Sequence, residues 1–515
     1  MVIININNNK MSSQVTPPLS SLTNDKLIQL CKERGITKYS KKNKTQLIAL
    51  INQHFASASV NTASTIEAPT PTPVPVPMPI QSHSNSAFTF VDLFCGIGGF
   101  HQALTKLNGT CVFACDIDDN CRKVYENNYG ISPAGDITKV VIQNVPPHDV
   151  LCAGFPCQAY SKAGFQKGFN DATRGNLFFD MCKIIAHHKP KYLLLENVKN
   201  LTSHDNGNTW KVISERIESL GYYTYATPLV LNVLHFNVPQ NRERVIIMCK
   251  RKDLGSLQPL PEIPINPKLT LTVTIPDIVS NTTAAEKHAC AITGKMKHVE
   301  RIWDRFIKLL IAHHIPIPKF PIWTDWWDNE LPSSVISPVE NTFEMEDKEE
   351  NVENVENEEN AETDGSTTTT AFYAKYKSWI DKNRAFYNQH IVLLEPWLSE
   401  SRTCAQWLGA VRKFEWQAGD LLENDGMHTV LWTARGSGIR VKRPNYIPTL
   451  VAMSMIPVYG PESRKLTPRE LLRLQSFPET FKYDEKTIFK QVGNTVNVKM
   501  IEQCAGFLIF GQPIF

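Results

Sequence analysis

Residues 88–99 read Phe-Thr-Phe-Val-Asp-Leu-Phe-Cys-Gly-Ile-Gly-Gly, an apolar run that ends in a glycine-rich turn. Such a run is typical of a buried strand in a parallel sheet. Gly96, Gly98 and Gly99 let the backbone turn sharply and approach a ligand closely, and we expect a helix to begin near His101. Nucleotide-binding sites have this order of strand, glycine loop and helix, although the glycine spacing here is not GxGxxG. Taken alone, the pattern also fits an ordinary tight turn.

A second apolar run, residues 111–115, ends at Asp116, which lies 20 residues after Gly96. In doubly wound sheets an acidic residue at such a strand tip binds ribose hydroxyls. The two runs together therefore favour a ligand site at the carboxyl edge of an α/β sheet over an ordinary turn.

Four further sequence blocks follow the glycine loop. They are Pro156-Cys157-Gln158, Glu196-Asn197-Val198, Gln240-Asn241-Arg242-Glu243-Arg244 and Gln491-Val492-Gly493-Asn494-Thr495. In order and chemistry the five blocks resemble those of the cytosine-C5 methyltransferases, which use S-adenosylmethionine. The resemblance covers roughly residues 87–254 and 466–515. It implies the class I S-adenosylmethionine-dependent methyltransferase fold, a Rossmann-like α/β fold with a mostly parallel sheet flanked by helices.

The resemblance assigns residues to a pocket for S-adenosyl-L-methionine. Phe94, Gly96 and Gly98 would surround the methionine end of the cofactor, and Asp116 would hold the ribose. Ile117 stands where the family usually has a bulky residue against the adenine face, and isoleucine can pack there but cannot stack like an aromatic ring. Asp136 matches the acid that accepts a hydrogen bond from the adenine amino group. The other matched cofactor positions are Ile137, Pro156, Leu177, Asn494 and Val496.

The family's chemistry explains why the catalytic residue types are needed. C5 of cytosine is a poor nucleophile, so the ring is first activated by covalent addition of a thiolate, which Cys157 offers, at C6. Glu196 can protonate or hydrogen-bond N3 of the ring, and Arg242 and Arg244 supply positive charge beside the pyrimidine carbonyl and the adjacent phosphate. Taken singly, each residue has an ordinary structural interpretation. Taken jointly, with intact neighbours in every block, they favour an active enzyme.

Residues 256–460 lack the shared blocks, as expected for the family's inserted target-recognition domain. The stretch Arg435-Gly436-Ser437-Gly438-Ile439-Arg440-Val441-Lys442-Arg443 combines glycines, which permit close approach to a groove, with side chains that address guanine edges or phosphates. We expect it to contact DNA, the alternative being an ordinary basic loop. Pro448-Thr449-Leu450 resembles the Thr-Leu doublet at the end of the family's recognition region. The DNA-binding residues expected are Gln158, Ser161, Arg435, Arg440, Lys442, Arg443 and Thr449.

The composition along the chain predicts a modular organisation. We expect residues 1–18 to be disordered, 56–86 to form a Ser/Thr/Pro-rich linker, and 87–255 with 461–515 to form the catalytic domain, with an acidic disordered insert at 340–370 inside the recognition domain. Residues 19–55 predict a small α-helical hairpin with apolar faces at Leu27, Leu30 and Cys31 and at Leu47, Leu50 and Ile51, surrounded by lysines. This segment resembles the SAP-type DNA-binding module, the alternative being a solvated helical hairpin.

Composition predicts a soluble intracellular protein of more than one domain. The chain has 515 residues, 42% of them hydrophobic, and a formal net charge of +3. Its twelve cysteines include no CxxC pair, and no long apolar span or secretory signal appears. Cys111, Cys115 and Cys121 therefore favour structural roles over a metal site. We expect double-stranded DNA as the partner, no metal, no membrane association and a monomer.

These observations predict a DNA (cytosine-5-)-methyltransferase that flips its target cytosine out of the duplex. One alternative is the tRNA-methylating branch of the superfamily, whose Cys-Phe-Thr tripeptide is absent from this sequence. The other is a catalytically silent DNA-binding protein, against which the intact Cys157, Glu196, Arg242 and Arg244 argue.

Overall fold

A computed structural model describes residues 87–156, 177–263, 271–327, 365–402, 409–452 and 455–514, with a few positions between Thr23 and Ile51. The chain divides into two compact units, Met1–Ile80 and Gln81–Phe515. In the first unit Leu27, Cys31, Ile36, Leu47 and Ile51 form a buried apolar cluster, and residues 44–48 are helical. Four of these five residues are ones that the sequence assigned to the apolar faces of a helical hairpin. Leu30 and Leu50 lie outside the described residues.

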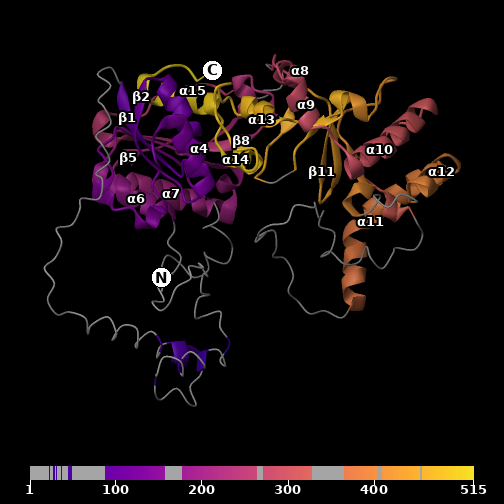
Figure 1. The fold of residues 1–515 in the computed structure, drawn as a ribbon, viewed down its shortest axis with the longest axis horizontal. Helices are drawn as coiled ribbons and strands as arrows, with labels where there is room; N and C mark the ends of the chain where they lie inside the picture. Colours follow the sequence, from indigo (N-terminus) through magenta and orange to yellow (C-terminus); the bar gives the residue numbers. More distant parts are fainter. Residues whose placement is uncertain are drawn as a thin grey trace, which may run out of the picture. The chain divides into compact units, whose positions relative to one another are not determined.

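The second unit contains a seven-stranded sheet in the order β2-β1-β3-β4-β8-β5, with β6 paired to β8 (Figure 1). Strands β1 to β4 are mutually parallel, and β8 is antiparallel to β4, β5 and β6, so only β8 runs against the others. This confirms the mostly parallel sheet of the class I methyltransferase fold. The strands are β1 Phe88–Leu93, β2 Gly109–Cys115, β3 Val150–Gly154, β4 Tyr192–Val198, β5 Tyr222–Tyr223, β6 Leu229–Asn232 and β8 Glu243–Arg251.

Helices cover both faces of this sheet because successive strand residues point to opposite sides. Phe90, Cys152 and Leu194 belong to one buried cluster, with α3 (Gly99–Lys106), α4 (Asp119–Tyr129) and α15 (Val498–Phe510). Their neighbours Val91, Leu151 and Leu193 belong to a second cluster, with α6 (Leu177–His188) and α7 (Asn208–Ser219). Figure 1 shows α6 and α7 on the side of the sheet opposite α15. The final helix therefore returns to the first sheet, where it packs against α3.

A second, six-stranded sheet with the order β15-β14-β11-β12-β10-β9 is built from residues between 322 and 465. One face packs on α10 (Gly294–Ala312) and α12 (Ile391–Arg402) through a core that includes Trp303, Trp397 and Trp432. The strands are β9 Ile322–Trp323, β10 Lys413–Trp416, β11 Leu431–Arg435, β12 Gly438–Lys442, β14 Val458–Tyr459 and β15 Arg464–Lys465. This sheet lies within the region expected to read DNA.

Short elements connect the two sheets. Strand β7 (Gln240–Asn241) pairs in parallel with β13 (Ile447–Pro448), which joins the Gln-Asn-Arg-Glu-Arg block to the end of the second region. The remaining helices are α8 Ile275–Val279, α9 Ala284–Ala289, α11 Gly365–Gln389, α13 Pro468–Leu474 and α14 Ile488–Asn494.

The structure departs from two local expectations. Helix α11 begins at Gly365, inside the acidic segment expected to be disordered across 340–370. The acidic run itself ends at Asp364 and gives way to Ser, Thr and apolar residues that a helix tolerates. The apolar run 192–195 predicts a strand with Glu196 at its tip, but β4 continues to Val198 and Glu196 lies inside it. Residues 1–18, 56–86 and 340–364 lie outside the described residues.

Candidate active site

The glycine loop follows β1 directly and has the backbone conformation that its sequence predicts. Phe94, Gly96 and Gly98 have φ values of 56°, 52° and 87°, in the left-handed region. A Cβ added at Gly96 would meet nothing within 4 Å, so the loop faces open space there. The amide of Gly96 donates to Asp116 Oδ2 at 2.7 Å, which holds the loop beside the tip of β2. The structure thus brings together two features that lie 20 residues apart in the sequence.

Tyr129, which the sequence analysis did not single out, supports this loop from α4. Its hydroxyl donates to the carbonyls of Ile97 and Gly98 at 3.2 and 3.0 Å. A Cβ at Gly98 would lie 2.3 Å from the Tyr129 ring, so only glycine fits. No motif marks this tyrosine, and only its distance to the loop reveals it.

The residues expected to hold ribose and adenine gather beside the tip of β2. Both carboxylate oxygens of Asp116 accept from backbone amides, those of Gly96 and Asp118. The side chain of Ile117 is 75% exposed, an unusual state for an isoleucine at the end of a buried strand. A bridge between Cys115 and Ala134 brings Asp136 alongside. An exposed apolar side chain and two acids therefore lie at or near the tip of β2.

The expected Asp136 also has a local structural role. It caps a 3-10 turn (Ile137–Lys139), because its Oδ1 accepts from the amide and the hydroxyl of Thr138 at 3.0 and 2.8 Å. These hydrogen bonds lower the pKa of the Asp136 carboxyl. An ionised Asp136 is an acceptor only, as the adenine amino group requires.

The C-terminal block lies beside the start of α3. A Cβ at Gly99 would lie 2.6 Å from Val496 Cγ2, so the start of α3 and the residues after α14 are in close contact. Val496 is buried and Asn494 is exposed. Leu177, at the first position of α6, is half-buried against the opposite core. Of the expected cofactor residues, all are described, and Phe94, Asp116 and Val496 adjoin the glycine loop.

A buried polar cluster lies behind the glycine loop. Asp92 has no exposed surface, and its two carboxylate oxygens lack a well-aligned hydrogen bond among the described residues. Burial raises the pKa of Asp92 well above its ordinary value, and the charge of Asp116 raises it further. His101 Nδ1 lies 2.7 Å from the Tyr125 hydroxyl, and burial lowers the pKa of His101 to about 3. Burial thus favours the neutral forms of both Asp92 and His101.

The nucleophile expected from the sequence, Cys157, lies outside the described residues, as do Gln158 and Ser161. The chain is described as far as Phe155 and Pro156, directly before it. Asn197 is buried and donates to the Phe155 carbonyl at 2.9 Å. Residues Gly154 and Glu196 are register partners in the parallel pair β3 and β4. The last residue of β3, Gly154, thus lies beside Glu196.

Glu196 forms a sequestered ion pair with Arg244 on the neighbouring antiparallel strand β8. Arg244 Nε lies 2.9 Å from Glu196 Oε1, and each side chain is only 11% exposed. Burial raises the pKa of Glu196, against the opposing charges of Arg244 and Arg242. The Arg244 guanidinium anchors one oxygen of this carboxyl, and the other oxygen is left for a ligand. Because its pKa is raised, the carboxyl also takes up a proton more readily than an ordinary glutamate.

Arg242 has contacts that differ from those expected of a residue beside the pyrimidine. It is 1% exposed and donates to the carbonyls of Leu450, Gly493 and Thr495 at 2.8–3.1 Å. Because these bonds fix the guanidinium inside the protein, Arg242 links backbone carbonyls and does not point into the site. The sequence could not show this, since its partners are carbonyls more than 200 residues away, which every residue type possesses.

A family model described as C-5 cytosine-specific DNA methylase matches residues 88–313 and 327–509, which is more than half of the chain. The chain belongs to this family. Members of the family use S-adenosylmethionine. The match includes every block on which the predicted resemblance depended.

Individual C-5 cytosine methylases match the chain to different extents. Type II methyltransferase M.HhaI of Haemophilus parahaemolyticus is 49% identical over 166 residues, 32% of this chain and 50% of that protein. M.HpaII of Haemophilus parainfluenzae is 50% identical over 171 residues, 33% of this chain and 47% of that protein. The chain thus spans about half the length of these two relatives.

Type II methyltransferase M.AluI of Cellulosimicrobium cellulans is 31% identical over 476 residues, 80% of this chain and 90% of that protein. Residues outside 256–460 make up less than two thirds of the chain. A match that covers 80% of the chain therefore extends into the region expected to recognise the target.

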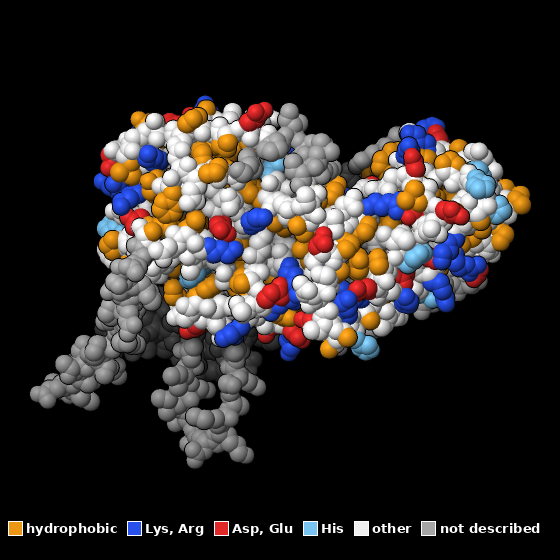
Figure 2. Space-filling view, turned by 90° about the horizontal axis from the view of Figure 1, so that it is seen from above, with side chains coloured by type: hydrophobic (Ala, Val, Ile, Leu, Met, Phe, Trp, Pro, Cys, Tyr) orange, Lys and Arg blue, Asp and Glu red, His pale blue; other side chains and the backbone are white. Residues whose placement is uncertain are grey.

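In this chain the basic stretch 435–443 forms the end of β11, a two-residue turn, β12 and the residue after it. Its cations differ in their contacts. Arg443 is committed to Asp425 and to the carbonyls of Ala418 and Asp420, and Arg440 Nε pairs with Glu415 at 2.9 Å. Lys442 Nζ lies 5.7 Å from the Tyr446 ring centroid. Figure 2 shows Lys and Arg interspersed with Asp and Glu on the face in view, not gathered into one patch.

Thr449, also expected at the DNA, makes a contact within the protein. Its hydroxyl donates to the Asn241 carbonyl at 2.8 Å, beside the paired strands β7 and β13. It therefore links the end of the region expected to recognise the target to the block that carries Arg242 and Arg244.

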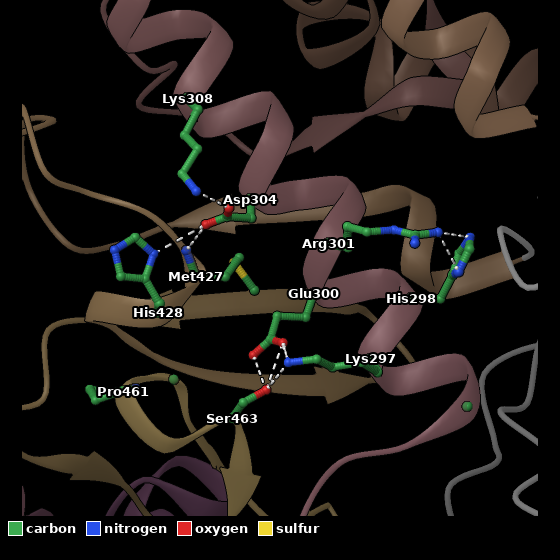
Figure 3. A pocket seen from close by; sticks show the side chains of 12 residues that line it. Lys297, His298, Glu300, Arg301, Asp304, Lys308, Met427, His428, Pro461 and Ser463 are labelled. Carbon is green, nitrogen blue, oxygen red and sulfur yellow. Dashed lines mark hydrogen bonds and ion pairs between the residues drawn. The ribbon is translucent and has the colours of Figure 1, made fainter.

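A separate cavity of 680 Å³ lies between α10 and the turns around Met427 and Ser463 (Figure 3). Its charged side chains pair with one another. Lys308 contacts Asp304 at 2.6 Å, and Lys297 contacts Glu300 at 2.6 Å. Ser463 donates to the same Glu300 carboxylate. Because acids and cations alternate along its wall, this cavity has no uniform charge for binding an anion.

The described residues contain no candidate membrane span and no candidate metal site. None of the helices described is long and apolar enough to cross a lipid bilayer. Among the described side chains, no three of His, Cys, Asp or Glu come together as metal ligands would.

Proposed function

We propose that this C-5 cytosine methylase transfers a methyl group from S-adenosyl-L-methionine to C5 of a cytosine in double-stranded DNA. The observation that carries the proposal is the buried Glu196–Arg244 pair, situated beside the point where the Cys157 segment leaves β3. A proton-holding acid next to a thiol is the combination that activation of a pyrimidine ring requires.

In the proposed mechanism, the Cys157 thiolate adds to C6 of the flipped cytosine and forms a carbon–sulfur bond. Glu196, whose pKa is raised by burial, would give a proton to N3 and so neutralise the charge that the attack creates. Arg244 holds the Glu196 carboxyl in place throughout. S-adenosylmethionine, when bound, supplies an electrophilic methyl group for C5. Loss of the C5 proton to water, elimination of the Cys157 thiolate and return of the N3 proton to Glu196 then restore the aromatic ring.

The proposed cofactor site uses Phe94, Gly96 and Gly98 for the methionine end, and Asp116, Ile117 and Asp136 for the nucleoside. The open space at Gly96 and the exposed Ile117 support this assignment. Ile137, Pro156, Leu177, Asn494 and Val496 complete the proposed wall.

The domain organisation is also part of the proposal. Residues 87–255 and 461–515 would form the catalytic domain, and 256–460 the target-recognition domain. Residues 19–55 would form a DNA-binding module, joined by the linker 56–86. The two sheets and the return of α15 to α3 support the division between catalysis and recognition, except that β15, at Arg464–Lys465 within 461–515, belongs to the second sheet.

A duplex that carries 5-fluorocytosine tests the covalent route. Fluorine cannot leave as a proton does, so the enzyme should remain bound to C6 as a denaturant-stable adduct in the presence of S-adenosylmethionine. Cys157→Ala should form no adduct and should transfer no methyl group, while it still binds the cofactor. Cys290→Ala is the matched control, since Cys290 lies in a different region and should behave as wild type.

The outcomes separate the alternatives. Adduct formation on tRNA but not on duplex DNA would favour the RNA-methylating function. Appreciable turnover by Cys157→Ala would contradict the covalent mechanism. A wild-type protein that binds duplex DNA but forms neither adduct nor methylated product would be a silent DNA-binding protein.

A further inference from the structure

The second sheet has one apolar face and one polar face at β10, β11 and β12. Phe414, Trp432 and Val441 are buried in the core shared with α10 and α12. Their neighbours along each strand point to the opposite face. Cross-strand register places Thr433 beside Arg440, Glu415 beside Arg440, and Arg435 beside Gly438 on that face. The polar face thus carries several cations and a single acid, Glu415, on these three strands.

The three arginines of this region are not equivalent. The Arg443 guanidinium chelates both oxygens of Asp425, whose side chain is 3% exposed, and its Nε donates to the Ala418 carbonyl at 2.9 Å. It therefore holds the 418–425 loop. Arg440 uses Nε for Glu415, which also accepts from Gln417. Arg435 is half-buried, and among the described residues no hydrogen bond or ion pair reaches its guanidinium.

This state of Arg435 is costly in the free protein. A partly desolvated guanidinium loses hydration, and Arg440 adds like-charge repulsion nearby. Both effects lower the pKa of Arg435, burial more than Arg440. Acceptors brought by a ligand would offset this cost.

The local backbone holds Arg435 in a defined position. It is the last residue of β11 and pairs with Gly438 across the turn Gly436-Ser437. Gly438 has φ +121°, and a Cβ there would lie 2.6 Å from Lys413 Cβ, so the turn is packed against β10. A Cβ at Gly436 would meet nothing within 4 Å, so the turn also faces open space. The turn thus ends the β11–β12 hairpin, the inner strand pair of the six-stranded sheet, and can present Arg435 to base edges in the major groove of B-DNA.

We propose that Arg435 is the specificity-determining arginine of this enzyme and reads a guanine of the target site through O6 and N7. Its uncommitted fork of N–H donors matches those two acceptors, which is the commonest specific contact in the major groove. Arg440, restrained by Glu415, has one edge left for DNA. Arg443 is a positioning residue for the 418–425 loop. This inference rests on the proposed function, because it takes duplex DNA as the substrate.

The test is methylation of a pool of duplexes with random bases on both sides of a central cytosine, followed by bisulfite sequencing. The full-length wild type should prefer guanine strongly at one position. Arg435→Ala should lose about 5- to 150-fold of that discrimination at that position alone. Arg435→Lys should lose it as well while retaining DNA affinity, because a lysine keeps the charge but not the bidentate fork.

Two further variants control for folding and charge. Arg443→Ala should lower the melting temperature without changing the preferred base at any position. Arg305→Ala removes an exposed arginine of α10, which pairs with Glu400, and should match the wild type in stability and preference. Melting curves for every variant separate lost folding from lost recognition.

An Arg435→Ala or Arg435→Lys enzyme that keeps the wild-type preference at every position would overturn the inference. A uniform loss of rate across all sequences would also overturn it, since that result marks a phosphate contact. If the wild type methylates no cytosine in any duplex, both the proposed function and this inference are wrong. If the wild type is active and the Arg435 variants keep its base preference, the inference is wrong but the proposed function still stands.

Discussion

At the residue scale, the two arginines of the Gln-Asn-Arg-Glu-Arg block have different partners. Arg244 pairs with Glu196, and Arg242 binds carbonyls of the C-terminal block and of Leu450. The sequence predicted both as catalytic because a motif identifies positions, not the direction of each side chain. The partner of Arg244 is itself a motif residue, so that pair could be expected, whereas backbone carbonyls carry no sequence signal.

Glu196→Gln should separate proton transfer from binding. The amide keeps a hydrogen-bonding group beside N3 but has no proton to give, so kcat should fall about 10²–10⁴-fold, with little change in DNA affinity. Because burial raises the pKa of Glu196, the protonated form persists above the ordinary range of a glutamate. Its contribution to the rate should decline as pH rises through that raised pKa.

The measurement is kcat against pH for the wild type and Glu196→Gln. The alkaline decline assigned to Glu196 should be absent from the residual activity of the variant. Equal kcat in both enzymes would remove Glu196 from the chemistry. A matched change at Glu243, which pairs with Lys199 on the surface, should leave the profile unaltered.

At the element scale, the strands of the first sheet were predictable because most are apolar runs of four to nine residues. The second sheet was not, because its strands have two to five residues and pair across long separations, as β9 does with β10. Lys413-Phe414-Glu415-Trp416 does alternate polar and apolar residues, a strand signal that could have located Glu415 beside the basic stretch.

The unit of β1, glycine loop and α3 predicts an unusual pH dependence of stability. Asp92 has a folded pKa well above its unfolded value, so its stabilising contribution is complete below the unfolded pKa and is lost as pH rises through the folded pKa. Asp92→Asn removes this loss. Relative to the wild type, it should gain up to about 1.4 kcal/mol in free energy of unfolding per pH unit between the two pKa values.

Urea unfolding at several pH values between 5 and 8 tests this expectation. Asp149→Asn is a control of opposite sign, because hydrogen bonds from Thr89 and Lys191 keep the pKa of Asp149 below its ordinary value despite partial burial. That change should destabilise the protein most at neutral pH. A difference between wild type and Asp92→Asn that does not vary with pH would contradict a neutral Asp92.

The junction of β7 with the loop after α14 depends on Arg242. Arg242→Lys keeps the charge but cannot reach three carbonyls, and each lost hydrogen bond to a charged group costs about 1.5–3 kcal/mol. We expect a lower melting temperature and a raised KM for S-adenosylmethionine, with kcat at saturation less affected. A large loss of kcat at unchanged stability and KM would instead place Arg242 beside the reacting ring. Arg251→Lys is the control, because Arg251 forms a partly exposed ion pair with Asp253.

At the scale of the whole molecule, the first unit is separate from the unit that carries every motif of the family. A lysine-rich module on a Ser/Thr/Pro-rich tether would raise the local concentration of DNA without choosing the base. Deleting residues 1–86 should therefore leave the methylated sequence and maximal rate nearly unchanged. It should raise the KM for long DNA, most clearly at low salt, where attraction to phosphate is least screened.

Steady-state methylation by full-length and truncated enzyme across a salt series measures this effect. Identical DNA dependence would show that residues 1–86 do not bind DNA. A changed target sequence would show that they do more than tether. Neither result would alter the assignment of the catalytic site, since no proposed catalytic residue lies in the deleted segment.

Transfer of a deuterated methyl group tests the central claim most directly. The protein is incubated with S-adenosylmethionine labelled in its methyl group and with unmethylated duplex DNA, which is then digested to nucleosides and analysed by mass spectrometry. The proposed function predicts labelled 5-methyldeoxycytidine, made by the wild type and absent with Cys157→Ala. Label on the exocyclic amine of cytosine or adenine, or in no nucleoside, would contradict it.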